Sequence, residues 1–251
     1  MNRKAEIHAA YEHLGTHAAH YDGMMTGTSV FGCLALRFLW QFSKEEYASY
    51  MAHLLASVPH DFAGSLLEVP VGTGSLTMPL YQTLPRAKIT CLDYSGKMLD
   101  VARKLAGEMS LSNVVLQQGD VGALPFGDGT FDHVLTVNGL HAFPQKDAAL
   151  DEMCRVLAPG GIFSGSCYVR GERSVTDIFV RTFCTWRGFF TPPYDTADSL
   201  RSRLAARYES VHLHTIGSFA EFICKKNEES FDSSALSFHP KRNCKPYRRK
   251  V

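Results

Sequence analysis

Apolar residues follow two different spacings along this chain, and the two spacings alternate. From Lys44 to Val58 they recur every three or four positions, which predicts an amphipathic helix. Residues 66–71 instead form a short apolar run, typical of a strand that is buried on both faces of a parallel sheet. Further short apolar runs occupy residues 88–92, 113–118, 133–137, 162–169, 210–217 and 219–225. Between several of these runs, apolar residues recur at helical spacing, at residues 75–84, 95–105, 145–157 and 196–208.

This alternation predicts an α/β fold. Strands joined by a crossover helix become parallel neighbours in one sheet. The last two runs meet at Gly217 and Ser218, so a tight turn makes them antiparallel. We therefore predict one doubly wound, seven-stranded, mostly parallel sheet with a terminal antiparallel strand and a small helical cap.

The glycine turn after the first strand is the first candidate site. Gly72 and Gly74 let the backbone approach a ligand closely. Ser75 can cap the helix that is predicted to run to Leu84, and the start of a helix offers free N–H groups. A Gly-x-Gly turn is nevertheless common, and by itself it identifies no ligand.

A nicotinamide dinucleotide site is the nearest alternative, because it also uses a glycine-rich turn after a strand. Such a site has a third glycine three positions after the second. This chain has Thr77 there, which disfavours a tightly packed pyrophosphate. The next strand ends in Asp93, whose carboxylate can bind the two hydroxyls of a ribose.

A longer series of short motifs is far more specific than the turn. The series continues with Gly119-Asp120-Val121, Leu124-Pro125-Phe126, Phe131-Asp132 and Pro159-Gly160-Gly161. In this order, over roughly residues 20–224, the chain resembles the class I S-adenosylmethionine-dependent methyltransferases. It is most similar to the small-molecule branch that contains the ubiquinone and menaquinone C-methyltransferases. The resemblance implies a Rossmann-like methyltransferase fold, S-adenosylmethionine as cofactor and a small-molecule methyl acceptor.

The resemblance also implies a set of cofactor-binding residues. Asp120 would accept a hydrogen bond from the adenine amino group, since an ionised acid accepts from that donor. The alternative for Asp120 is a turn aspartate that bonds its own backbone. Tyr21 would lie over the cofactor, unless it belongs to an ordinary junction between helix and loop. The full set is Tyr21, Glu68, Pro70, Gly72, Thr73, Gly74, Asp93, Tyr94, Met98, Gly119, Asp120, Val121, Asn138 and Gly139.

Pro70 departs from the family pattern, which has a glycine at this position of its first motif. Proline fixes φ and lacks an N–H group. The fixed φ suits the extended end of a strand, and the last residue of a strand need not have a ladder partner. We therefore interpret Pro70 as tolerated.

His141 is the one candidate catalytic residue. It follows the fourth strand, and an open parallel sheet binds its ligands beyond the carboxyl ends of the strands. Imidazole is the side chain best suited to remove a proton near neutral pH. The alternative is a histidine that orients the loop or contacts the cofactor. Methyl transfer asks little of side chains, so positioning and exclusion of water should carry much of the catalysis.

Two aromatic-rich segments, Phe31–Trp40 and Arg170–Tyr194, interrupt the regular alternation. We predict that they form a cap that walls off an acceptor pocket; the alternative is helices packed on the edge of the sheet. The expected organisation is N-terminal helices with part of the cap at 1–58, a cofactor-binding core at 59–226 with a cap insertion at 170–195, and a basic tail without packed structure at 227–251.

Composition narrows the class of protein. The 251 residues, 45% of them hydrophobic, suffice for one α/β core, and a net charge of +1 gives no sign of a nucleic-acid partner. No apolar run reaches the ~20 residues of a membrane helix. The first residues lack the core of a signal peptide, and seven cysteines without a C-x-x-C pair predict a reduced, cytoplasmic protein. His13, His17 and His20 share a helix face, but nothing completes a metal site there, so we expect no metal.

Three other functions remain open. A nucleic-acid or protein methyltransferase would need a basic surface, or an acceptor motif where this chain has Asn138-Gly139-Leu140-His141. A nicotinamide oxidoreductase is disfavoured by Thr77. A non-catalytic protein of the same fold would bind the cofactor without transferring its methyl group. The sequence does not identify the acceptor, the atom that is methylated or the oligomeric state.

Overall fold

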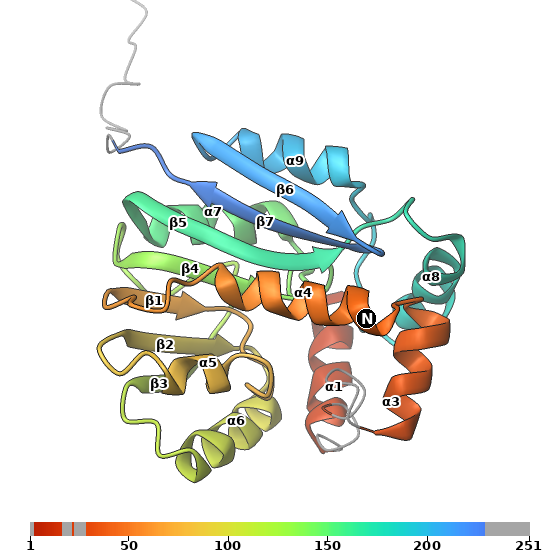
Figure 1. Cartoon of the computed structure of the whole chain (residues 1–251), viewed down its shortest axis with the longest axis horizontal. Helices are drawn as coiled ribbons and strands as arrows, with labels where there is room; N and C mark the ends of the chain where they lie inside the picture. The colour runs from red at the N-terminus through yellow and green to blue at the C-terminus, as the bar shows by residue number, and fades with distance from the viewer. Residues whose placement is uncertain (1–2, 17–21, 23–28, 229–251) are drawn as a thin grey trace, which may run out of the picture.

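A central sheet lies between two layers of helices (Figure 1). The computed structural model describes residues 3–16, 22 and 29–228. Almost all of the predicted tail therefore lies outside the described residues, as do Tyr21, His17 and His20. All seven predicted strands are present, and the predicted fold class is confirmed.

The strands lie in the order β3-β2-β1-β4-β5-β7-β6. Their bounds are β1 Ser65–Glu68, β2 Lys88–Asp93, β3 Val114–Gln118, β4 Phe131–Val137, β5 Leu157–Tyr168, β6 Ser210–Ile216 and β7 Phe219–Lys225. The order reverses between β1 and β4, and open α/β sheets bind their ligands at such a point. The predicted antiparallel strand is β7, the last in the chain, which lies between β5 and β6 rather than at the edge of the sheet.

Helices cover both faces of the sheet. α4, α5 and α6 contribute to one apolar cluster, and α7 and α9 contribute to the cluster on the other face. The helix bounds are α1 Arg3–Thr16, α3 Val30–Leu34, the π-helix η1 Ala35–Leu39, α4 Lys44–Ala56, α5 Met78–Gln82, α6 Gly96–Glu108, α7 Lys146–Val156, α8 Ser174–Phe179, the π-helix η2 Val180–Cys184 and α9 Ala197–Ala205.

The helix after the glycine turn is shorter than the predicted 75–84, because α5 spans only Met78–Gln82. Pro79 lies in its first turn, where a missing N–H leaves no hydrogen bond unmade, and Thr77 is the N-cap residue. Ser75 does not cap the helix as predicted. Its hydroxyl instead donates to Oδ1 of Asp22, 3.0 Å away.

The predicted tight turn at Pro159-Gly160-Gly161 is wrong. These residues lie inside β5, which already begins at Leu157. The register between β4 and β5 shifts between Phe131 and His133, so the segment accommodates an irregularity of the ladder. Gly160 takes a φ of +71°, a left-handed conformation that glycine adopts without strain.

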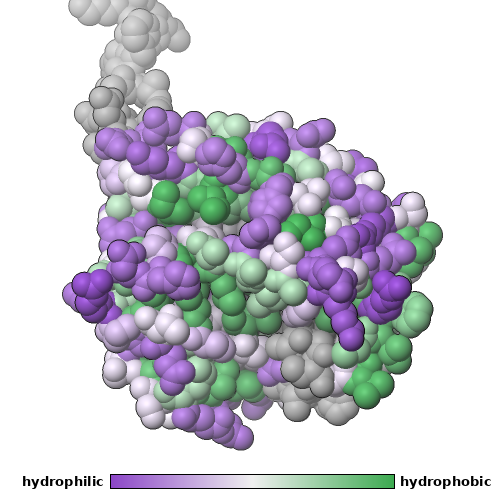
Figure 2. All heavy atoms as spheres, in the orientation of Figure 1, coloured by the Kyte–Doolittle hydropathy of each residue, from purple (hydrophilic) through white to green (hydrophobic). Residues whose placement is uncertain are grey.

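The two aromatic segments pack on each other at one end of the molecule. Trp40 is buried, and its ring lies 5.5 Å from that of Phe179 and 6.0 Å from that of Phe190. Figure 2 shows apolar surface at this end, over α3 and α8, where Leu34 of α3 and Ile178 of α8 are exposed. Within the described ranges, no helix has the length and apolar character that crossing a membrane requires.

Candidate functional site

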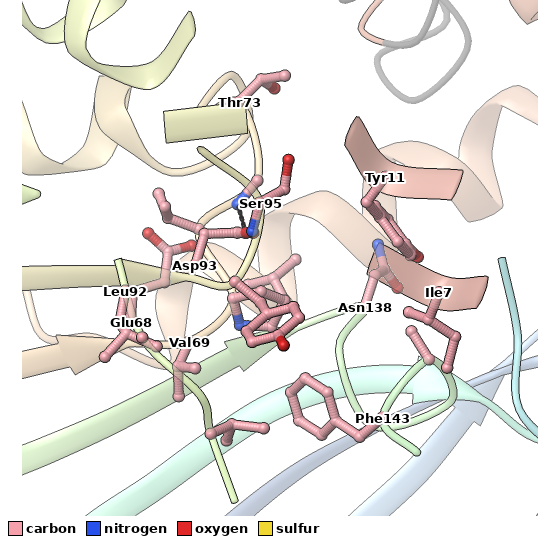
Figure 3. Close-up of a pocket in the computed structure, with 18 of the residues that line it drawn as sticks. Ile7, Tyr11, Glu68, Val69, Thr73, Leu92, Asp93, Ser95, Asn138 and Phe143 are labelled. Carbon is pink, nitrogen blue, oxygen red and sulfur yellow. Dashed lines mark hydrogen bonds between the residues drawn. The ribbon is translucent and has the colours of Figure 1, made fainter. Parts of the chain in front are cut away.

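A pocket opens at the carboxyl ends of β1, β2 and β4, beside the reversal of strand order. Ile7 and Tyr11 of α1 lie on one side of it, and Glu68, Leu92 and Asp93 at the ends of β1 and β2 lie on the other (Figure 3). The empty space within the pocket measures about 1050 Å³, which includes solvent at its open mouth. Eleven of the predicted cofactor-binding residues line it: Glu68, Pro70, Gly72, Thr73, Gly74, Asp93, Tyr94, Gly119, Asp120, Val121 and Asn138.

Asp93 organises the glycine turn. Its Oδ2 accepts a hydrogen bond from the N–H of Gly72 and its Oδ1 accepts one from the N–H of Ser95, each at 2.8 Å (Figure 3). The side chain lies at the end of β2 and is almost completely buried. Burial raises the pKa of Asp93 to about 6, although the backbone N–H groups of Ser95 and Gly72 oppose the shift. Each carboxylate oxygen keeps a second lone pair for a ligand.

The glycine turn leaves room above its backbone. Gly72 and Gly74 have φ values of +58° and +76°, which an L-residue with a side chain adopts only with strain. A Cβ at Gly72 would meet no atom within 4 Å, so the missing side chain leaves open space. At Gly74 a Cβ would lie 2.5 Å from the Cε of Met78. The turn therefore fits a ligand that approaches the backbone at Gly72.

Glu68 is bonded to its own scaffold. It is buried at the end of β1, and its Oε2 accepts hydrogen bonds from the hydroxyls of Thr77 at 3.0 Å and Tyr81 at 2.8 Å. Burial raises the pKa of Glu68 to about 8, against the opposing effect of these two hydroxyls. Glu68 thus joins β1 to α5 beneath the pocket, in addition to lining it.

Asp120 accepts a hydrogen bond from the backbone of its own turn, which is the alternative to the predicted bond with adenine. Its Oδ1 accepts from the N–H of Gly122 at 3.0 Å. Its Oδ2 contacts Nζ of Lys4, which belongs to α1. The carboxylate raises the pKa of Lys4 through this hydrogen bond. Asp120 is only partly buried and still faces the pocket, so both roles are compatible with its position.

Helix α1 forms a wall of the pocket that the sequence did not predict. Lys4, Ile7, His8 and Tyr11 line the pocket, whereas none of the described side chains of Phe31–Trp40 and Arg170–Tyr194 lines it. The described wall on this side of the pocket therefore comes from α1. Glu12 of α1 accepts hydrogen bonds from the hydroxyl of Ser95 at 2.8 Å and from the N–H of Lys97 at 3.3 Å, and this attaches α1 to the start of α6. At its other end, the side chain of Arg3 donates to the carbonyl of Thr185 at 3.2 Å.

Asn138 lies directly after β4 with a φ of +55°, an uncommon value for a residue other than glycine. Its Oδ1 is 3.2 Å from the hydroxyl of Tyr50, which also lies 2.8 Å from Oγ of Ser166. Tyr50 is buried in α4, so a helix on the face of the sheet positions this pocket residue.

Two predicted cofactor residues, Gly139 and Met98, do not line the pocket, and a third, Tyr21, is not among the described residues. Gly139 lies behind it, where a Cβ would be 2.3 Å from Cδ of Pro70 and 2.7 Å from Cζ of Phe143. Met98 is fully buried in α6. Tyr21 lies outside the described residues, although the adjacent Asp22 accepts hydrogen bonds from the hydroxyls of Thr73 and Ser75.

The position of His141 does not suit the predicted base. The ring is buried, is absent from the lining of the pocket and packs 3.8 Å from the ring of Phe190. Its Nδ1 accepts a hydrogen bond from the N–H of Tyr168 at 3.0 Å, so the neutral ring carries its proton on Nε2. Burial, and then the charge of Lys146, lower the pKa of His141 to about 3. These contacts make His141 a residue that joins the loop after β4 to β5.

We expect His141→Ala to destabilise the protein more than it slows chemistry. Loss of the ring leaves the buried N–H of Tyr168 without its acceptor, which costs about 1–3 kcal/mol of the free energy of unfolding. In His141→Asn an amide oxygen can replace Nδ1 as the acceptor but cannot act as a base. Urea unfolding and turnover should therefore both recover in the asparagine variant. A stable asparagine variant whose turnover stays roughly 10²–10⁴-fold below that of the wild type would instead support His141 as the general base.

Comparison with known proteins finds similarity over the same part of the chain. Residues 66–161 match the model of a methyltransferase domain. The demethylmenaquinone methyltransferase of Staphylococcus epidermidis is 35% identical over 121 residues, which cover 48% of this chain and 49% of that protein. The demethylmenaquinone methyltransferase of Thermus thermophilus is 40% identical over 96 residues, which cover 38% of this chain and 43% of that protein. The chain thus matches about half the length, or less, of these curated relatives.

Solved structures agree on the fold. An S-adenosylmethionine-dependent methyltransferase of Thermotoga maritima superimposes with a TM-score of 0.62 at 18% identity, covering 87% of this chain and 99% of that one. The [4+2]-cyclase SpnF superimposes with a TM-score of 0.60 at 19% identity, covering 71% of this chain and 80% of that one. At these identities the likeness concerns architecture alone, and the second protein carries the name of a different reaction.

Proposed function

We propose that this chain, whose central domain is of the class I methyltransferase family, transfers a methyl group from S-adenosylmethionine to a small apolar molecule. One observation carries the proposal: most of the residues that line the pocket at the strand ends belong to the segment 66–161 that matches the family model. The glycine turn, the buried acid at the end of β2 and the acid after β3 line this single pocket. The spacing of these groups suits a nucleoside with a charged tail.

Each cofactor contact is part of the proposal. Asp93 would bind the ribose hydroxyls through its remaining lone pairs, and Asp120 would accept from the adenine amino group. The backbone at Gly72 would take the closest approach of the ligand, since no side chain fills the space above it. When bound, S-adenosylmethionine supplies a methyl group on an electron-poor sulfonium.

The walls of the pocket favour an apolar acceptor. Ile7, Val69, Val137 and Phe143 line it, together with the ring of Tyr11. The relatives are named as methyltransferases of demethylmenaquinone, which supports an acceptor with a quinone-like ring. We propose that these walls hold the ring beside the methyl group and exclude water, which contributes to the rate without a dedicated base.

The domain organisation is also proposed. Residues 1–58 and 170–195 would enclose the acceptor, with α1 as the inner wall and the aromatic segments behind it. This arrangement rests on the hydroxyl of Tyr11, which donates to the carbonyl of Phe189 at 3.2 Å and so joins α1 to the second aromatic segment.

Calorimetry and a transfer assay test the function. We expect S-adenosylmethionine and its demethylated product to bind and NAD not to bind, and we expect methyl transfer to a demethylated naphthoquinol. Binding of NAD would overturn the cofactor assignment. Cofactor binding without transfer to any of a broad set of small molecules would instead favour a non-catalytic protein or a different reaction on the same fold, as with the cyclase. Transfer only to a nucleic acid or a protein would favour the remaining alternative.

A further inference from the structure

A second cluster of polar side chains lies away from the pocket, between α4 and the last two strands. Glu221 of β7 pairs directly with His214 of β6, so their side chains lie on the same face of the sheet. His53 of α4 reaches the same place, since α4 runs across that face next to β7 (Figure 1). Three segments distant in sequence thus bring two imidazoles and one carboxylate together.

The distances between these groups suit metal coordination. Nε2 of His214 lies 2.8 Å from Oε2 of Glu221, and Nδ1 of His53 lies 3.6 Å from the same oxygen. All three candidate ligand atoms lie within 4.8 Å of one another. A tetrahedral ion with bonds of about 2.0–2.2 Å separates its ligand atoms by roughly 3.3–3.6 Å. Small side-chain rotations would therefore complete the geometry.

The carboxylate of Glu221 is the second and independent sign of a ligand. Its side chain is only 5% exposed, yet neither oxygen has a hydrogen-bond partner within the part of the chain that the structure describes. The 2.8 Å contact with His214 does not have the direction of a hydrogen bond. A buried ionised acid without donors is costly, and a cation bound at Oε2 would reduce the cost.

We propose that His53, His214 and Glu221 bind a divalent ion of the zinc class. Two imidazoles and one carboxylate are the ligands that Zn²⁺, Co²⁺ and Ni²⁺ accept, whereas Ca²⁺ and Mg²⁺ prefer oxygen alone. The imidazoles are about half exposed, so the ion enters from solvent and keeps at least one position for water. The ion joins α4 to the β6–β7 hairpin.

The site is linked to the pocket through α4. Tyr50 lies three residues before His53 and so on the same helix face. Its hydroxyl contacts Asn138 at the pocket and Ser166, which pairs with Glu221 across β5 and β7. An ion that fixes α4 on the sheet therefore also fixes the residue that positions Asn138.

The untagged full-length chain, first treated with a chelator, tests the site. Titration with Co²⁺ is followed by visible absorption, and titration with Zn²⁺ is followed by calorimetry. We expect one saturable site in the wild type and a higher melting temperature with Zn²⁺. Glu221→Gln and His53→Ala should each weaken metal binding by about 100-fold, because mutation of a residue that only orients a metal ligand already lowers metal affinity by about 10–100-fold.

His212→Ala is the matched control. His212 is an exposed histidine two residues before His214 on the same strand, so it faces the same side but lies outside the cluster. The His212→Ala variant should bind Co²⁺ and Zn²⁺ as the wild type does. Because His53 is exposed on a helix, His53→Ala should fold even if Glu221→Gln does not. The proposal is overturned if the wild type lacks a saturable site, if His53→Ala binds normally, or if His212→Ala loses binding.

Discussion

Asp93→Ala is expected to weaken binding of S-adenosylmethionine by about 1.5–3 kcal/mol, or roughly 10- to 150-fold. The side chain lines the pocket at the end of β2, where its free lone pairs face the proposed ribose. From the sequence alone the substitution should leave the fold intact. The structure changes this expectation, because Asp93 also holds the N–H groups of Gly72 and Ser95. The melting temperature of the ligand-free variant should therefore fall as well.

Asp132→Ala is the control that separates a loss of stability from a loss of cofactor affinity. Asp132 accepts hydrogen bonds from the N–H and the hydroxyl of Ser65 at 2.8 and 2.9 Å, but it lies near the start of β4, away from the pocket. This control should lose stability without losing cofactor affinity by calorimetry. An Asp93→Ala protein with normal affinity and a lowered melting temperature would make Asp93 purely structural.

Glu68→Leu is expected to cost several kcal/mol of the free energy of unfolding. The hydroxyls of Thr77 and Tyr81 are buried and donate to Glu68, and each loses its acceptor at about 1–3 kcal/mol. Glu68→Gln keeps an oxygen in the same place and should be far milder. Urea unfolding of the two ligand-free variants at pH 6 measures the difference. Equal loss in both would show that loss of the acceptor oxygen does not account for the destabilisation.

The pH dependence of stability should distinguish Glu68→Gln from the wild type. The pKa of Glu68 is about 8 in the folded protein, above its ordinary value of 4.5. The folded state therefore holds a proton that the unfolded state has released, and stability falls as the pH rises between these two values. From pH 6 to pH 8 the wild type should lose about 2 kcal/mol more than Glu68→Gln. Parallel pH profiles for the two proteins would contradict the raised pKa.

The strands could be predicted because their apolar runs reflect burial on both faces of the sheet. Helix boundaries were less predictable, as α5 shows. Ser75 looks like an N-cap in sequence, but its hydroxyl bonds Asp22, and Pro79 sets the first turn instead. Which partner a serine takes depends on segments that are distant in the chain.

Much of the pocket lining could also be predicted, since the motifs lie at strand ends that one sheet edge brings together. The contribution of α1 could not, because its apolar residues show no clear period and its contacts are to residues some 80 to 180 positions away. The same holds for His53, His214 and Glu221, which no local spacing connects. His141 is the opposite case: its position after β4 suggests chemistry, whereas its buried contacts favour packing.

The attachment of α1 has a consequence for turnover. The helix is bonded to α6 through Glu12, to the segment after η2 through Arg3, and to the loop after β3 through the contact of Lys4 with Asp120. The proposed cofactor would lie beneath α1, so that opening of these bonds would widen its exit. We therefore expect departure of the demethylated product, rather than the transfer step, to limit the steady-state rate. Rapid-quench kinetics would then show a burst of one methylation per active site.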